Sequence, residues 1–174
     1  MPTLAEQLRE TTPVSVLVRK ARRLGIRDVD AALQVAGARG CRHYQPTHPK
    51  PGLDPGRDLL PDDELTILLL SGENPYHPTA IRCAAQLARS PQNDPVHLAL
   101  LAGHYKTLRV LAHIARAGLA HDPEGHSFWQ TLLNHLPPVP VQPEPDLPHW
   151  SRFVSMAGRQ RQGPVSPQWL VPQP

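Results

Sequence analysis

The chain has little cysteine, few aromatic residues and no long hydrophobic run. Two cysteines in 174 residues are too few for the disulfide framework of a small secreted protein. The longest apolar run, Leu65–Leu70, includes a threonine and is far too short to cross a membrane. The N-terminal stretch MPTLAEQLRETTP lacks the apolar segment of a signal peptide. These absences predict a cytoplasmic protein with no membrane association.

Recognisable catalytic motifs are also missing. The sequence contains no phosphate-binding loop, no dinucleotide glycine pattern and no paired acidic motif. The tetrapeptide SGEN at 71–74 follows an apolar segment but lacks the pattern around a hydrolase nucleophile. Cys83 falls among alanines on a predicted helix, where a buried thiol is inert. We therefore expect a protein that is not an enzyme and carries no cofactor.

The abundant residues favour helices. Leucine, alanine and valine make up most of the apolar residues, while aromatic residues account for only 5%. Alanine and leucine are strong helix formers, whereas strands favour β-branched and aromatic residues. We predict an all-α fold, in which short helices form a small orthogonal or antiparallel bundle and a proline-rich, extended C-terminal arm follows.

Proline and glycine divide the chain into four regions. Residues 41–61 hold five prolines and two glycines, and residues 137–174 hold ten prolines. Neither stretch keeps a helical period, which indicates a surface loop and an extended tail. The predicted regions are three short basic helices in 1–40, a loop or linker in 41–61, a helical core in 62–136 and an arm in 137–174.

Short local signals mark where each helix starts and stops. Proline suits the first helical position, aspartate caps the N-terminus, and glycine closes the C-terminus. On this basis Asp122 and Pro123 open the last helix, and Gly118 closes the one before it. Asp28 or Asp30 caps the third helix, which ends at Val35. The other predicted helices cover 4–10, 13–24, 62–70, 78–89, 95–102 with a break at Gly103, 105–117 and 123–136.

The segment DPVHLALLAGH, residues 94–104, resembles the first part of an ankyrin repeat. The residues that match the spacing of that family's TPLHxAAxxGH segment are Pro95, Val96, His97, Ala99, Gly103 and His104. The resemblance covers about eleven residues and implies a pair of helices. No second copy follows at the family's repeat length, and a solenoid needs about three repeats. A generic helical hairpin explains the same residues.

Cations gather on two of the predicted helices. Residues 1–60 carry ten lysines and arginines against six acidic residues. The first group is Arg19, Lys20, Arg22, Arg23 and Arg27, and the second is Lys106, Arg109, His113 and Arg116, which share one helix face. The first group could be a solvated face, a contact to nucleic-acid phosphates or a contact to an acidic protein surface. The second group could be a solvated face or a docking site for a phosphate or carboxylate. The first group wraps around its helix without interleaved aromatics, which is atypical of a base-stacking surface.

The tail carries aromatic residues that a purely solvated arm does not need. Its large apolar residues are Trp150, Phe153, Met156, Trp169 and Leu170. One interpretation is that these side chains fold back onto the helical core. The other is that they anchor the arm on a partner protein or on a second copy of the chain.

Cysteine and histidine together raise the question of a metal site. Cys41, His43 and His48 are close in sequence, and Cys83 or another histidine could complete four zinc ligands. Structural zinc sites usually show ligand pairs at short spacing on both sides, and the second pair is missing. We predict no metal site.

Taken together, these patterns predict a non-enzymatic helical protein–protein interaction or adaptor module, which could also self-associate. The alternative is a nucleic-acid-binding protein that uses the basic N-terminal helix. An enzyme without a readable motif is the third option.

Overall fold

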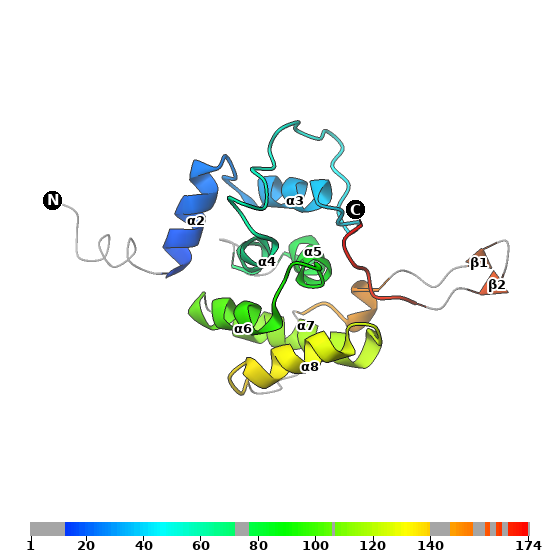
Figure 1. Cartoon of the computed structure of the whole chain (residues 1–174). Helices are drawn as coiled ribbons and strands as arrows, with labels where there is room; N and C mark the ends of the chain where they lie inside the picture. Colours follow the sequence, from blue (N-terminus) through cyan, green and yellow to red (C-terminus); the bar gives the residue numbers. More distant parts are fainter. Residues whose placement is uncertain are drawn as a thin grey trace.

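The protein is all-α (Figure 1). The computed structural model describes residues 13–71, 77–105, 107–139, 147–154, 159–160, 163–164 and 167–173. Within these residues lie seven α-helices, a short 3-10 turn and a hairpin of two strands with two residues each. The helix predicted over 4–10 lies outside the described residues. In the described part of the chain, no helix has both the length and the apolar character that crossing a membrane requires.

The two helices of the N-terminal region follow their predicted starts. Helix α2 covers Pro13–Arg23 and helix α3 covers Val29–Ala38. Asp28 caps α3, since its Oδ1 accepts a hydrogen bond from the backbone N–H of Ala31 at 2.8 Å. The sequence prediction ended α3 at Val35, but the helix continues for three more residues. A glycine inside a helix costs only about 1 kcal/mol, so burial of the helix against the core carries it through Gly37.

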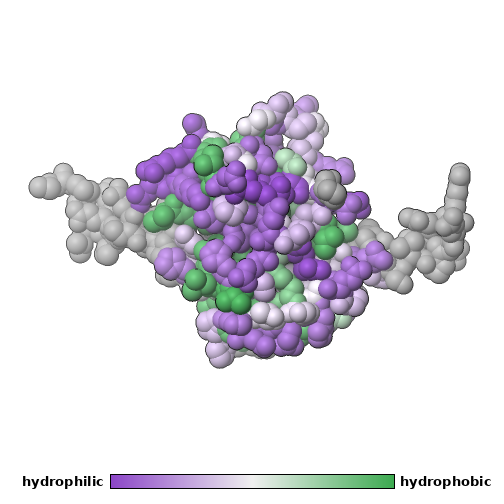
Figure 2. Space-filling view, in the orientation of Figure 1, coloured by the Kyte–Doolittle hydropathy of each residue, from purple (hydrophilic) through white to green (hydrophobic). Residues whose placement is uncertain are grey.

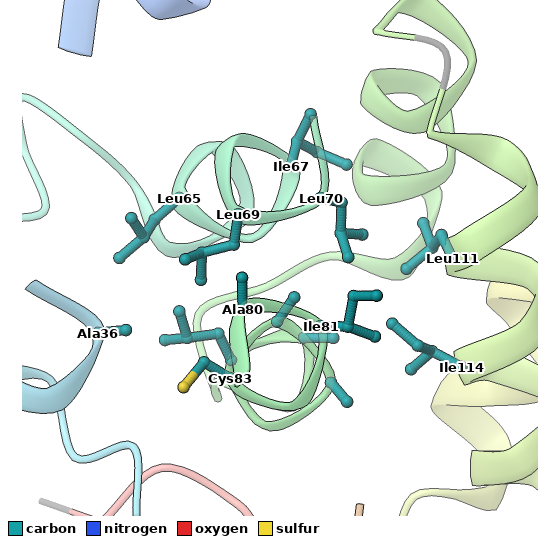
Figure 3. Packing of buried hydrophobic residues seen from close by; sticks show 14 of the residues in the cluster. Ala36, Leu65, Ile67, Leu69, Leu70, Ala80, Ile81, Cys83, Leu111 and Ile114 are labelled. Atoms are coloured by element: carbon teal, nitrogen blue, oxygen red, sulfur yellow. The ribbon is translucent and has the colours of Figure 1, made fainter. Parts of the chain in front are cut away.

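Helices α4 (Asp62–Leu70) and α5 (Pro78–Ala88) form the centre of the molecule. Figure 1 shows them side by side, with α3 on one side and α6, α7 and α8 on the other. The alanines of α5 are fully buried, and small side chains let the two helices approach closely. In Figure 3, Leu69 and Leu70 of α4 lie toward α5, and Ile81 faces Leu111 and Ile114. A single hydrophobic cluster joins α2 and α3 to the remaining helices.

The last three helices differ from the sequence prediction at their ends. They are α6 (Pro95–His104), α7 (Leu108–His121) and α8 (His126–His135). Gly103 lies inside α6 rather than at a break, and Gly118 lies inside α7 rather than at its end. Asp122 and Pro123 do not open α8, which begins three residues after Pro123. The local signals were misleading here because Asp122 is used for tertiary contacts.

Asp122 is a buried carboxylate that binds three partners. Its Oδ2 accepts hydrogen bonds from Trp129 Nε1 and from Arg89 Nε, each at 2.7 Å. Its Oδ1 accepts the backbone N–H of Gly125 at 3.0 Å. The carboxylate therefore fixes the turn between α7 and α8 and holds the Trp129 ring against α7.

A second buried network orders the long loop between α3 and α4. The Arg39 side chain, only 1% exposed, donates from Nη1 to Asp62 Oδ1 at 2.9 Å and to the Leu60 carbonyl at 2.7 Å. Its Nη2 pairs with Asp54 at 2.6 Å. Burial alone would lower the pKa of Arg39, but the hydrogen bonds and charges of Asp54 and Asp62 together raise it above its usual value.

The C-terminal region returns to the helical core. After a 3-10 turn, η1 (Trp150–Arg152), strand β1 (Arg159–Gln160) pairs antiparallel with β2 (Gly163–Pro164). Val154 and Trp169 then form an isolated antiparallel bridge. Figure 1 shows β1 and β2 standing away from the helices, while the final residues run back alongside α3 and α5.

Gly118 tests how tightly Trp129 packs on α7. A Cβ at position 118 would lie 2.3 Å from the Trp129 ring, whereas one at Gly103 would meet only Leu108 Cδ2 at 3.9 Å. We expect Gly118→Ala to lower the free energy of unfolding by about 2–3 kcal/mol through overpacking. The control Gly103→Ala should be neutral or stabilising by up to about 1 kcal/mol. Urea unfolding of both variants measures these free energies. Equal losses of stability in Gly118→Ala and Gly103→Ala would contradict the close packing of Trp129 on Gly118.

Candidate functional site

An open groove lies beside α2, and we call it the α2 groove. Its volume is about 400 Å³. The residues that line it are Val16, Arg19, Lys20, Arg23, Leu24 and Leu59. Five come from α2 and its end, and Leu59 comes from the loop before α4. In Figure 2, green hydrophobic areas lie between purple hydrophilic ones where Figure 1 draws α2.

The α2 groove combines apolar and cationic side chains at the surface. Val16 and Leu59 are 52% and 54% exposed, which is high for large hydrophobic residues. Leu17 and Ala21, on a neighbouring face of α2, are buried in the core. The helix therefore uses one apolar face for folding and leaves Val16 available for contact with another molecule.

Two polar side chains from other helices meet the edge of the α2 groove. Lys20 forms an ion pair with Glu64, in the first turn of α4. Burial raises the pKa of Tyr105, and the nearby Glu64 carboxylate raises it further. The ends of α2, α4 and α6 thus converge here, and Glu64 offsets part of the positive charge of the groove.

The structure separates the predicted basic residues into different environments. Arg19, Lys20 and Arg23 line the α2 groove, while Arg22 and Arg27 are exposed outside it. Lys106 lies outside the described residues, and Arg109 is exposed on α7.

Two members of the second predicted basic face have tertiary contacts. Arg116 Nη2 donates to the Val139 carbonyl at 3.0 Å, and His113 Nε2 lies 2.7 Å from the Pro148 carbonyl oxygen. These two side chains hold Val139 and Pro148 close to α7. The prediction of a phosphate or carboxylate docking site on α7 thus gains no support from Arg116, because its Nη2 already binds the Val139 carbonyl.

The aromatic residues of the tail fold back onto the core. Phe153 and Trp169 are 1% and 7% exposed, and the centroid of the Trp169 ring lies 5.2 Å from that of Trp129. Trp150 stacks on His121 with ring centroids 3.8 Å apart. Leu170 is partly buried, and Met156 lies outside the described residues. A partner could reach Phe153 and Trp169 only after the tail is released.

The two cysteines are buried free thiols. Cys41 Sγ donates to the Cys83 carbonyl at 3.7 Å. A hydrogen bond with the Cys83 thiol, together with burial, raises the pKa of Cys41 far above its usual range. A thiol that is not ionised is a poor nucleophile, so neither geometry nor charge favours catalysis by Cys41.

The residues considered as zinc ligands are not brought together. Within the part of the chain that the structure describes, no group of three or more histidine, cysteine or acidic side chains is placed to hold a metal ion. His43 instead lies partly buried near Arg82 and the backbone of Phe153.

Sequence reasoning missed the apolar half of the α2 groove. Val16 falls outside the helical repeat of Leu17, Ala21 and Leu24, so its exposure was readable from that spacing. Leu59 gave no such signal because it lies in a loop without periodicity, 35 residues after Leu24.

No protein-family model, no curated protein and no solved structure matches this chain. The functional argument therefore depends on the geometry of the chain itself.

His43 predicts a loss of stability in acid. Burial, and then the charge of Arg82, lower the pKa of His43 from 6.5 to about 4. Between these values the unfolded chain binds the proton and the folded chain does not, so stability falls as the pH falls from 6.5 to 4. We expect His43 to account for roughly 1–2 kcal/mol of this loss after solvent screening.

The measurement is urea unfolding at several pH values across this window. The variant His43→Gln should be less sensitive to acid than the wild type. The variant His48→Gln, in the exposed part of the same loop, should behave like the wild type. An unchanged pH dependence in His43→Gln would show that another group is responsible.

Proposed function

We propose that this chain is a non-enzymatic protein-interaction module that binds an acidic, amphipathic segment of a partner protein in the α2 groove. In this proposal the protein is a small bundle of short helices with a C-terminal arm, and the bundle presents the α2 groove. The observation that carries it is the pairing of exposed Val16 and Leu59 with three cations around one groove of about 400 Å³.

Charge and shape both favour a protein ligand. When a partner covers exposed apolar side chains, the burial stabilises the complex by about 25 cal/mol for each Å² of apolar surface removed from water. The surrounding cations would attract acidic residues and disfavour basic ones, which adds specificity and speeds association. A helix with leucines on one side and glutamates beside them fits both requirements.

A nucleic acid fits the α2 groove less well. Phosphate binding needs cations but gains nothing from Val16, Leu24 and Leu59. None of the six lining residues is aromatic, so bases have no stacking partner in the groove. On α7, the Arg116 side chain binds the Val139 carbonyl. Nucleic-acid binding therefore stays the second candidate, supported by the exposed Arg22 and Arg27.

The experiment starts with selection from a random peptide library on the full chain. We expect enrichment of peptides that combine acidic residues with leucine or phenylalanine. A selected peptide should bind Leu59→Ser and Arg23→Gln about five- to ten-fold more weakly than the wild type, because each change removes about 1 kcal/mol. Fluorescence polarisation at two salt concentrations measures these affinities.

Matched controls separate the two candidate functions. Leu100→Ser removes an exposed leucine from α6, and Arg27→Gln removes an exposed arginine outside the groove. Neither should change peptide binding. Binding to generic duplex DNA that falls steeply with salt, and that weakens equally in Arg23→Gln and Arg27→Gln, would favour the nucleic-acid alternative.

A further inference from the structure

The last described residues, 167–173, pack against the core at a site that we call the tail groove. The residues that contact them come from parts of the chain that are far apart in sequence. They are Gly40 from the loop after α3, Gln86 from α5, Trp129 from α8 and Phe153 after η1. None of these residues lines the α2 groove.

The tail groove binds the backbone of the tail at three successive points. The N–H of Leu170 donates to the Phe153 carbonyl at 3.3 Å. Gln86 Nε2 donates to the Val171 carbonyl at 2.8 Å. The N–H of Gln173 donates to the Gly40 carbonyl at 3.1 Å. An extended peptide recognised through its backbone in this way is a common mode of protein–peptide binding.

Hydrogen bonds to the core orient the Gln86 amide for its contact with the Val171 carbonyl. Its side chain is 1% exposed, and its Oε1 accepts the N–H of Arg42 at 2.9 Å. The same Nε2 that meets Val171 also lies 3.2 Å from the Gly40 carbonyl. Because these bonds fix the orientation of the amide, little side-chain entropy remains to be lost when the tail binds.

Trp169 anchors the segment. Its ring centroid lies 5.2 Å from that of Trp129 and 5.4 Å from that of Phe153, and the side chain is 7% exposed. Trp129 is itself fixed by its hydrogen bond to Asp122. A buried tryptophan in a preformed aromatic pocket is typical of the residue that dominates a binding energy.

Gly40 makes room for the end of the segment. A Cβ at this position would lie 1.9 Å from the Gln173 carbonyl oxygen. Any other residue here would displace the tail backbone. The close approach is specific to this glycine, because Gly56 has a similar positive φ, 89° against 94°, with no atom within 4 Å of its Cβ position.

A segment that leaves its own core can make the same contacts on a second molecule. Its three backbone hydrogen bonds and the ring contacts of Trp169 would be the same there, so exchange replaces each contact with an identical one. Pro167 and Pro172 favour an extended backbone, which keeps the free segment close to its bound shape.

We propose that the tail groove is a peptide-binding site whose ligand in trans is residues 167–173 of a second copy of this chain, producing an arm-exchanged dimer. A second copy fits this site because its segment PQWLVPQ can form the three backbone hydrogen bonds and the Trp169 ring contacts that this segment makes within its own chain. This proposal and the one for the α2 groove involve different residues, so they fail independently.

The first test refolds the full chain from denaturant at low and at high protein concentration. Two versions that differ by an N-terminal mass tag are mixed before refolding, and native mass spectrometry counts dimers of mixed mass. We expect mixed dimers in the wild type and in Gly56→Ala after refolding at high concentration, and their loss in Gly40→Ala. Mixing the already folded proteins should give no mixed dimers, because exchange requires the tail to leave its groove.

The second test does not depend on dimer formation. In the full chain, Trp169→Ala removes the side chain that anchors the tail, which weakens the binding of the tail to its own core. A fluorescent PQWLVPQ peptide serves as the probe. We expect the peptide to bind this variant at least about ten-fold more tightly than the wild type, whose own tail competes at high effective concentration. The double variant Gly40→Ala with Trp169→Ala should lose binding, and Gly56→Ala with Trp169→Ala should keep it.

Two results would overturn the proposal. One is a wild type that stays monomeric after refolding at high concentration. The other is dimer formation or peptide binding that Gly40→Ala and Gly56→Ala affect equally. Circular dichroism of every variant confirms that it is folded before its binding is compared. If Trp169→Ala does not fold, the refolding experiment alone decides.

Discussion

The ion pair between Arg39 and Asp62 is the contact on which the rest of the structure depends. Arg39 follows the last residue of α3, Asp62 is the first residue of α4, and their side chains are 1% and 0% exposed. A buried charge is stable only when it is paired, and removing one partner costs about 3–5 kcal/mol. The pair adds little net stability compared with apolar packing. Its effect is to hold two helix ends at one distance and thereby select one path for the loop between them.

Both candidate surfaces are built on the loop that this pair controls. The loop has no helix or strand, so its path is set by side chains such as Asp54, which pairs with Arg39, and Leu60, which is fully buried. Leu59, next to Leu60, then points into the α2 groove. Gly40, next to Arg39, meets the end of the tail. The buried Arg39 side chain therefore helps to position Leu59 in the α2 groove and Gly40 in the tail groove, although the two surfaces have no residue in common.

A second buried carboxylate organises the other half of the molecule. Asp122 holds Trp129, and Trp129 forms the wall on which Phe153 and Trp169 pack. The chain has few aromatic residues, and three of them gather at this point. The anchoring of the tail is thus a consequence of the turn between α7 and α8, because a rotated Trp129 ring would leave Trp169 without its pocket.

The all-α class, most helix starts and the irregular loop could be predicted from the sequence, because capping, proline placement and helical spacing act between near neighbours. Asp28, Pro78 and Pro95 are used as local rules predict. The tertiary structure alone decided the roles of Asp122 and Gly118, since contacts to Trp129 outweigh a cap or a helix stop worth about 1 kcal/mol. It also decided that the tail aromatics are buried and that Leu59 joins α2. Such choices depend on residues distant in the chain, and no local pattern encodes which distant partner a side chain will meet.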